Sequence, residues 1–457
     1  MHDPIRRQVI PNDLCIGCGA CTVSLQPHIT MQLGDNGQYR PVFHSEPDAQ
    51  QLAAAARVCP FSGETVNEDQ IATALYGQGQ HWHHPAVGYG LAVHVGHAGD
   101  TGYRQQGSAG GLTSWLLSQL FAADEIDAVI GVGPLAQSDQ GTIHGYRIIT
   151  TAAELSQLAG SKYYPITLGH LLPELPAARY ALVGLPCFIK AARLLAREQP
   201  ERYGQIRYTL ALACGHLKSR HFADYLAWQQ GIAPHELRNI DFRVKRPGYP
   251  ANRYAIAVTS DTHTASKPAW RLRGTDWGEG CFKHRACDYC DDIAGETADI
   301  TLGDAWLPQC RDDWRGHNIL LTRSPRLEQL LQRAAKDGTI HLQPASVDDF
   351  LQAQAPNYRH RREALAGRIH RQQQAGHWLP QKRIPPAPWQ SPRQRHQQQA
   401  RETLREQSPK LFTRALHQRR KHVYERAIFP LQWRYHWHAG NLLRFLIKWL
   451  LAVRLRR

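Results

Sequence analysis

The first fourteen residues, MHDPIRRQVIPNDL, lack the apolar run of a secretion signal. Because nothing in this segment marks the chain for export, we expect a cytoplasmic protein whose cysteines stay reduced. A framework of disulfide bonds is therefore a poor interpretation of its ten cysteines, and metal ligation is a better one.

A second absence concerns the N-terminal cysteines, which are Cys15, Cys18, Cys21 and Cys59. A close C-x-x-C-x-x-C triplet with a remote Cys-Pro cysteine is the ligand pattern of a 4Fe-4S cluster in bacterial ferredoxins. The local fourth cysteine that would serve another cluster is missing, because Leu25 stands four residues after Cys21. The segment therefore predicts one cluster, with Gly17 and Gly19 allowing a tight loop around the sulfur atoms. The alternative is a structural zinc site, which rarely uses this spacing.

The middle of the chain alternates between short apolar runs and helical stretches. Residues 128–132 and 180–184 have the composition of buried strands, whereas 112–123 and 189–198 have that of helices. This order predicts an α/β core, with α+β elements as an alternative. The proline-rich run at 384–388 predicts a semi-rigid linker.

Further cysteines stand at the ends of expected strands or in a C-x-x-C pair, namely Cys187, Cys214, Cys287 and Cys290. Strand ends can bring distant residues into one pocket, so these four are candidates for a second cluster. Isolated buried cysteines are also common in cores, and that alternative stays open. Cys281 and Cys310 remain, and we interpret them as bystanders, although either could replace a member of the set.

Six motifs occur in order: RQQGSAGGLTSWLLSQLF at 104–121, SKYY at 161–164, VGLPCFIKAARLL at 183–195, ACGH at 213–216, RACDYC at 285–290 and ADITLGDAW at 298–306. Together they resemble the family of the coenzyme F420 hydrogenase/dehydrogenase beta subunit over roughly residues 85–345. Members with an N-terminal ferredoxin-like segment include chlorophyll-pathway reductases such as 7-hydroxymethyl chlorophyll a reductase. The resemblance implies an FAD-containing iron-sulfur flavoprotein, with Cys187, Cys214, Cys287 and Cys290 as ligands of the second cluster.

The run Ser108-Ala109-Gly110-Gly111 directly precedes an expected helix, whose free amides and positive end would face a phosphate group. The candidate flavin-binding residues are Arg104, Ser108, Gly110, Gly111, Thr113 and Lys162. The alternatives are a glycine turn that only allows close packing and ordinary solvated cations. No catalytic residue is assigned. The nearby candidates for a proton donor are His216, Tyr163, Tyr164 and Lys162. Asp304 is a weaker candidate for holding an element near the second cluster.

These patterns predict three parts: a ferredoxin-like 4Fe-4S domain at 1–80, a flavin and iron-sulfur domain at 85–376, and a basic, largely helical tail at 377–457. The expected function is transfer of electrons from ferredoxin or a similar acidic carrier, through two 4Fe-4S clusters and FAD, to an organic two-electron acceptor. The alternative is an electron-transfer beta subunit of a hydrogenase- or dehydrogenase-type complex, in which coenzyme F420 could be the substrate. The long extensions favour a stand-alone reductase.

The last segment, residues 441–457, has no acidic residue and mixes large apolar side chains with Arg and Lys. Charge interrupts it too often for a spanning helix. An amphipathic helix on the anionic inner face of the membrane is one interpretation, with Trp433, Trp437 and Trp449 suited to the interface. Packing on its own domain is an equal alternative. Nucleic-acid binding ranks lower, because no recognised module accompanies the charge.

Overall fold

The central sheet exposes apolar side chains to both of its faces, because successive residues of a strand point in opposite directions. In β6, Ala128 and Ile130 join one hydrophobic core and Val129 joins another. The eight strands lie in the order β15 (Ile340–Ala345), β5 (Ala92–Ala98), β14 (Asn318–Thr322), β13 (Ile300–Asp304), β9 (Ile206–Leu212), β8 (Tyr180–Gly184), β6 (Ala128–Pro134) and β7 (His144–Ile149). This computed structural model describes residues 3–99, 102–135 and 141–454, with the side chains of 451–454 left out.

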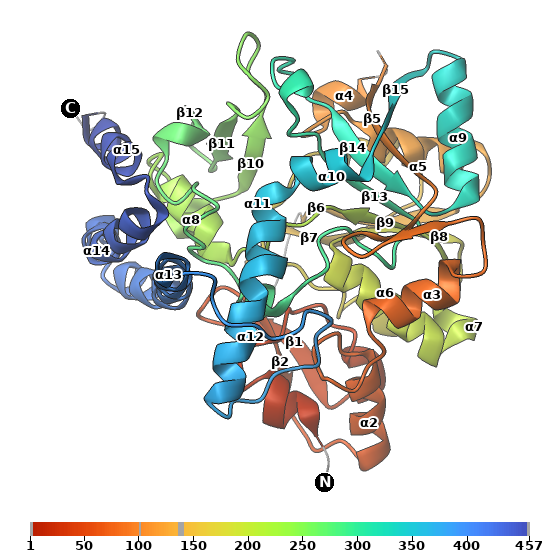
Figure 1. Cartoon of the computed structure of the whole chain (residues 1–457), viewed down its shortest axis with the longest axis horizontal. Coiled ribbons are helices and arrows are strands. Elements are labelled where there is room, and N and C mark those ends of the chain that lie inside the picture. The colour runs from red at the N-terminus through yellow and green to blue at the C-terminus, as the bar shows by residue number, and fades with distance from the viewer. Residues whose placement is uncertain (1–2, 100–101, 136–140, 455–457) are drawn as a thin grey trace.

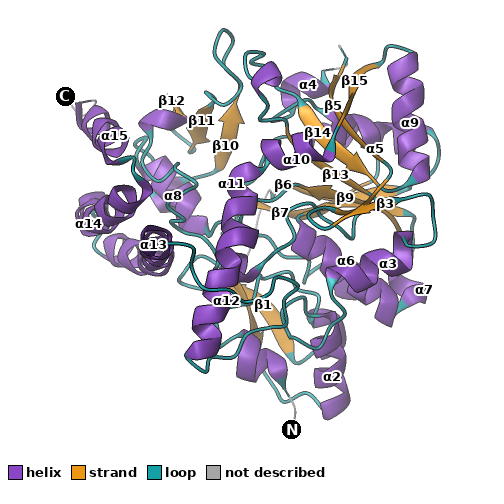
Figure 2. Ribbon diagram, viewed as in Figure 1, coloured by secondary structure: helices purple, strands orange, loops and turns teal. Residues whose placement is uncertain are grey.

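Helices cover both faces of this sheet, as Figures 1 and 2 show. Helices α5 (Leu112–Ala122) and α9 (Pro325–Lys336) pack on one face, and α6 (Pro186–Glu198) packs on the other. Strands β6, β8, β9 and β13 are parallel, whereas the pairs toward both edges are antiparallel. The expected α/β layering is confirmed, with a mixed sheet.

The N-terminal segment folds against α6 (Figure 1, red). It contains the π-helical turn η1 (Ile5–Val9), α1 (Thr22–Leu25), the hairpin of β1 (Ile29–Leu33) and β2 (Tyr39–Phe43), α2 (Ala49–Val58) and α3 (Glu68–Tyr76). Leu14 and Val58 share a core with Ile189 and Leu194 of α6. The segment is therefore joined to the main core by a continuous apolar interface.

The C-terminal helices pack on a second, smaller sheet. This sheet consists of β10 (Asn239–Val244), β11 (Ala255–Thr259) and β12 (Thr264–Pro268), with α8 (Arg220–Trp228) beside it; the C-terminal helices are α13 (Pro392–His417), α14 (Lys421–Ala439) and α15 (Leu442–Arg454). Phe222, Phe242, Phe412 and Tyr424 lie in one core formed by these elements. The expected helical C-terminal region is confirmed, and α13 and α14 pack on the protein itself. Arg456 and Arg457, which the sequence interpretation included, lie outside the described residues.

The remaining elements are short. They are β3 (Trp82–His84), β4 (Gly88–Gly90), α4 (Tyr103–Gln106), η2 (Ala152–Leu158), η3 (Leu172–Glu174), α7 (Pro200–Tyr203), η4 (Pro234–Glu236), η5 (Ala269–Arg271), η6 (Arg285–Tyr289), η7 (Pro308–Cys310), α10 (Val347–Ala353), α11 (Ala355–Tyr358), η8 (Arg359–Glu363) and α12 (Ala364–Gln374).

The segment expected to be a linker has neither helix nor strand between α12 and α13. It is nevertheless fixed to the core, because Arg383 forms ion pairs with Glu296 (2.7 Å), Asp291 (3.2 Å) and Asp69 (2.6 Å). Among the helices of the described chain, none has both the length and the apolar character needed to cross a bilayer.

A fully buried arginine, Arg323, connects the end of β14 to neighbouring loops. Its guanidinium donates hydrogen bonds to the carbonyl oxygens of Tyr89 (2.8 Å) and Val87 (3.1 Å) and to Thr301 Oγ1 (3.0 Å). Burial lowers the pKa of this group. The side chain therefore satisfies several acceptors that would otherwise be unpaired inside the protein.

We expect Arg323→Leu to lower the free energy of unfolding by about 3 kcal/mol, because it leaves buried acceptors without donors. The matched control is Arg326→Leu, whose side chain is 37% exposed and pairs with Glu125. That substitution should remove about 1 kcal/mol or less. Denaturant unfolding followed by tryptophan fluorescence measures both losses, and equal losses would contradict the role of Arg323.

Candidate metal and cofactor site

The carboxyl ends of three parallel strands meet at one edge of the sheet, which is where open α/β sheets place ligands. Strands β8, β9 and β13 lie side by side in parallel. Cys187 is the second residue of the helix that follows β8, Cys214 follows β9 after one residue, and Asp304 ends β13. Residues far apart in sequence therefore converge at this edge.

The second thiol group consists of Cys187, Cys214, Cys287 and Cys290, none of which forms a disulfide bond. Burial raises the pKa of Cys187, and the charges of Cys290, Cys214 and Cys287 raise it further. Burial likewise raises the pKa of Cys287 to about 12 and that of Cys214 to about 11. The mutual influence of these thiols shows that the structure brings all four together.

Backbone and side-chain donors point at the sulfur atoms of this group. The Leu217 amide donates to Cys287 Sγ at 3.3 Å, and Arg361 Nη2 donates to Cys290 Sγ at 2.5 Å. Arg361 is 2% exposed and also donates to the carbonyl oxygens of Cys290 (3.0 Å) and Asp292 (2.7 Å). Such hydrogen bonds stabilise thiolates and tune iron-sulfur clusters.

The first thiol group consists of Cys15, Cys18, Cys21 and Cys59, which the structure also brings together. Burial raises the pKa of Cys18 and Cys21, with further increases from the neighbouring thiols, and it raises that of Cys59 to about 12. Gly19 has φ +84°, and a Cβ there would lie 2.3 Å from the Gly169 amide nitrogen. Only glycine permits this close approach of the loop to the main core.

The two thiol groups are neighbours. The charge of Cys18 contributes to the raised pKa of Cys187, although burial and the second group contribute more. Burial also raises the pKa of Tyr146, with smaller contributions from Cys187 and Cys18. The Tyr146 side chain therefore lies within electrostatic reach of both groups.

The spacing of the sulfur atoms differs from that of a single metal ion. Among the described residues, the ligand atoms of Asp276, Glu279 and His436 lie within 4.8 Å of one another, whereas no three sulfur atoms of either thiol group do. A tetrahedral zinc ion would bring its sulfur ligands to about 3.8 Å from one another. The wider spacing fits a larger inorganic group better than zinc.

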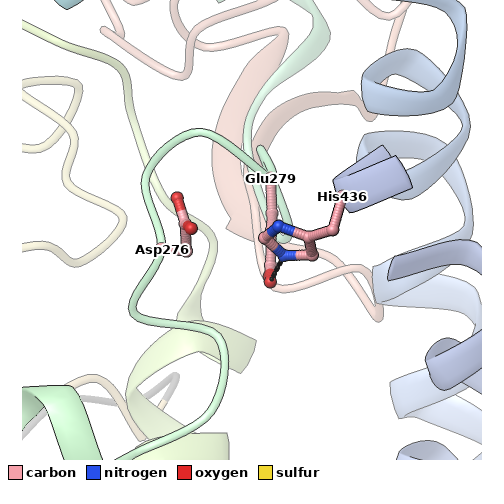
Figure 3. Close-up of side chains that lie close together, drawn as sticks. All are labelled: Asp276, Glu279 and His436. Atoms are coloured by element: carbon pink, nitrogen blue, oxygen red, sulfur yellow. Dashed lines mark hydrogen bonds and ion pairs between the residues drawn. The ribbon is translucent and has the colours of Figure 1, made fainter. Parts of the chain in front are cut away.

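The cluster of Asp276, Glu279 and His436 joins the C-terminal helices to the core (Figure 3). His436 Nε2 lies 2.9 Å from Glu279 Oε1, and Gln432 donates to Glu279 Oε2 at 2.9 Å. The buried Lys448 stands near both carboxylates, whose charges partly offset the effect of burial in lowering its pKa. The negative charge is therefore balanced by cations, and we interpret the cluster as an anchor for α14 and α15.

A cavity lies at the same edge of the sheet. Its lining includes Ser108, Gly111, Thr113, Lys162, Tyr146, Tyr163, Tyr164, Cys214, His216 and Asp304. Most of the expected flavin-binding residues thus border one space together with a member of the second thiol group. Two do not line it. Arg104 pairs with Asp313 at 2.8 Å and with the Gly316 carbonyl at 2.9 Å, and Gly110 packs where a Cβ would lie 2.7 Å from the Gly96 carbonyl.

The lining of this cavity suits an anionic, partly aromatic ligand. Gly111 caps α5 with φ +80°, and the first turn of α5 carries no acidic residue, so the positive helix end is available to a phosphate group. Lys162 Nζ, which donates to the Ala159 carbonyl at 2.6 Å, adds positive charge. His216 Nε2 and the Tyr146 hydroxyl are buried without a hydrogen-bond partner among the described residues. These features fit FAD.

Three charged residues of the site carry no recognisable motif. Arg243 forms an ion pair with Asp304 at 2.6 Å, and Lys218 is buried beside Trp277 with its ammonium 5.0 Å from the ring centroid. Burial lowers the pKa of Lys218 to about 8. Arg361 stands in a run of basic residues that looks like solvated surface. Nothing in the local sequence distinguishes these three from ordinary cations.

The sheet edge, the cavity and the two thiol groups define an α/β protein with a site of redox character. The family described as coenzyme F420 hydrogenase/dehydrogenase, beta subunit, matches in both of its parts: the N-terminal part at residues 93–173 and the C-terminal part at 177–348. These matches span more than half of the chain. The chain therefore belongs to the family of the coenzyme F420 hydrogenase/dehydrogenase beta subunit, as its motifs predicted.

Two relatives illustrate the likeness. A subunit of the F(420)H(2) dehydrogenase of Methanosarcina mazei is 24% identical over 324 residues, which make up 67% of this chain and 79% of that protein. A chain in a structure of the F420-reducing NiFe hydrogenase complex from Methanosarcina barkeri aligns with a TM-score of 0.48 and 15% identity, over 65% of this chain and 98% of that one.

These comparisons support an oxidoreductase class for the chain. Of the two functions that the sequence suggested, they favour the beta subunit of a complex over the stand-alone reductase. FAD, ferredoxin and the number of clusters stay predictions.

The contact between His436 and Glu279 generates a pH-dependent expectation. Burial lowers the pKa of His436, but the hydrogen bond and the charge of Glu279 outweigh it and leave the pKa above 6.5. The folded state therefore favours the protonated ring, and this stabilisation is fully present below about pH 6.5 and is lost as the pH rises through the folded pKa.

We expect the melting temperature of His436→Gln to fall furthest below that of the natural chain near pH 6, with the difference shrinking above neutrality. Thermal unfolding across this range measures the difference. His422→Gln, at an exposed position of the same helix, is the control. A difference that stays constant or grows with pH would contradict the assignment.

Proposed function

We propose that this chain is an electron-transferring beta subunit of a hydrogenase- or dehydrogenase-type complex, with two 4Fe-4S clusters and one FAD. The observation that carries the proposal is the convergence of two neighbouring groups of four buried thiols, the second of which borders the cavity through Cys214. Family membership supports the same class.

The first thiol group would hold one cluster and the second thiol group the other, within the domain limits of 1–80 and 85–376. The positive end of α6, where Cys187 is the second residue, favours negative charge on that thiolate. Arg361 lowers the pKa of Cys214, and Lys190 lowers that of Cys59, although burial outweighs both. The chain thus supplies positive charge beside each group.

The cavity would hold FAD, with Ser108, Gly111, Thr113 and Lys162 around its phosphate groups. When bound, iron-sulfur clusters supply one-electron transfer and the flavin supplies exchange between one- and two-electron chemistry. His216 lies on the cavity wall, and burial and nearby cations hold its pKa well below its usual value. A neutral imidazole at this position can accept a proton from a reduced ligand.

The proposed organic partner is a deazaflavin of the F420 type, since the relative from Methanosarcina mazei is named as part of an F420H2 dehydrogenase. The proposed protein partners are the other subunits of such a complex. Electron exchange with ferredoxin or a similar acidic carrier is the competing proposal.

Anaerobic purification followed by iron, sulfide and flavin analysis tests the cofactors. We expect about eight iron atoms and one FAD per chain. Cys18→Ser and Cys287→Ser should each remove about half of the iron, because each disrupts a different cluster. Cys310→Ser is the control and should leave the iron content unchanged. A preparation without iron or flavin after reconstitution would overturn the proposal.

The same preparation tests the partner. Reduction of an artificial dye by reduced F420, catalysed by the purified chain, supports the deazaflavin proposal. Activity only with reduced ferredoxin would support the competing one.

We expect Arg361→Gln to lower the reduction potential of the second cluster by about 60 mV, a tenfold change for one electron, because a positive charge and a hydrogen bond to sulfur are lost. Arg361→Lys, which keeps the charge, should cause a smaller decrease. A redox titration followed by electron paramagnetic resonance measures both. An unchanged potential in Arg361→Gln would show that Arg361 serves only the backbone.

A further inference from the structure

The outer side of α15 carries a stripe of large apolar residues that water surrounds. Leu443, Ile447 and Leu450 are 74%, 50% and 66% exposed. Their spacing of four and three residues places them on one face of the helix. Single exposed apolar residues are ordinary on protein surfaces, but a continuous row of them marks an interaction site. We call these three residues the apolar stripe.

The inner side of the same helix is already packed. Phe445 is 4% exposed, and its ring stacks on His436 with centroids 4.4 Å apart. Trp449 packs against Phe429 at 4.6 Å, and Lys448 Nζ donates to Thr275 Oγ1 at 2.8 Å. The helix is therefore fixed to the protein without help from the stripe, so stability of the fold does not explain it.

Exposed tryptophans extend the apolar surface onto α14. Trp433 and Trp437 lie one turn apart and are 39% and 65% exposed. Trp433 also packs against Phe429, which contacts Trp449 of α15. Tryptophan is the side chain most suited to the boundary between water and lipid, because its ring is apolar and its N–H is polar.

The charge around this surface is positive. Residues 391–457 contain three acidic residues, and all three are paired: Glu402 with Arg371, Glu406 with Lys410, and Glu425 with Arg273. Arg426, Arg434 and Arg444 are exposed on α14 and α15. Arg444 directly follows the first residue of the stripe. A cation so close to exposed apolar groups suits lipid phosphates above an acyl layer, whereas the centres of protein interfaces are depleted of charge.

We propose that the outer face of α14 and α15 binds the surface of an anionic bilayer, with the apolar stripe entering the acyl boundary and the arginines contacting headgroup phosphates. In Figure 1 α15 lies at the edge of the molecule, where a flat surface can reach it. The face lies beyond the residues that match the family, which end at 348. The proposal is therefore independent of the redox function.

The test is flotation of the full-length chain with vesicles of phosphatidylcholine alone, or of phosphatidylcholine mixed with phosphatidylglycerol. The stripe variant combines Leu443→Asn, Ile447→Asn and Leu450→Asn. The charge variant combines Arg434→Gln with Arg444→Gln. The control is Leu75→Asn, at a position that is 44% exposed elsewhere on the surface. Circular dichroism checks that every variant is folded.

The natural chain and the control should float with the anionic vesicles and stay behind with the neutral ones, and added salt should weaken the binding. The stripe variant should bind at least about tenfold more weakly, and the charge variant should lose most of its preference for anionic lipid. Absence of flotation, or equal binding by the stripe variant, would overturn the proposal. So would light scattering that shows a dimer of the natural chain and a monomer of the stripe variant, because the stripe would then bind a second copy.

Discussion

Burial of eight thiols side by side raises the pKa of those whose shift is resolved, and the rest of the site is arranged around that constraint. A buried thiol stays neutral unless positive charge compensates for lost hydration, and metal binding displaces its proton. The compensation comes from separate places in the chain, namely Lys190 in α6 and Arg361 in η8. The proposed clusters would complete it.

The topology of the sheet explains why these groups can meet. Parallel strands end at one edge, so β8 and β9 deliver Cys187 and Cys214 to the same place. The N-terminal segment then docks on α6, whose first turn holds Cys187, and this brings Cys18 close. A single rigid interface therefore fixes the distance between the two thiol groups, which an independent domain on a flexible linker would leave variable.

Local features of the site could be predicted from the sequence, because they depend on short-range chemistry. The spacing of Cys15, Cys18 and Cys21, the turn before α5 and the apolar runs of β6 and β8 all express themselves within a few residues. Long-range pairing could not be predicted. Arg104 is engaged by Asp313 rather than facing the cavity, and that partner lies 209 residues away. Periodicity and spacing contain no information about such contacts.

The C-terminal region looks like an appendage in sequence but is part of the site. Asp288, inside the C-x-x-C pair, forms buried ion pairs with Arg405 of α13 at 3.0 Å and with His360 of η8 at 3.2 Å. An unpaired carboxylate at that position would be strongly destabilising, so the turn that presents Cys287 and Cys290 depends on helices beyond the family match. The inner faces of these helices hold the thiol turn in place, and that packing is what directs the apolar outer face of α15 toward solvent.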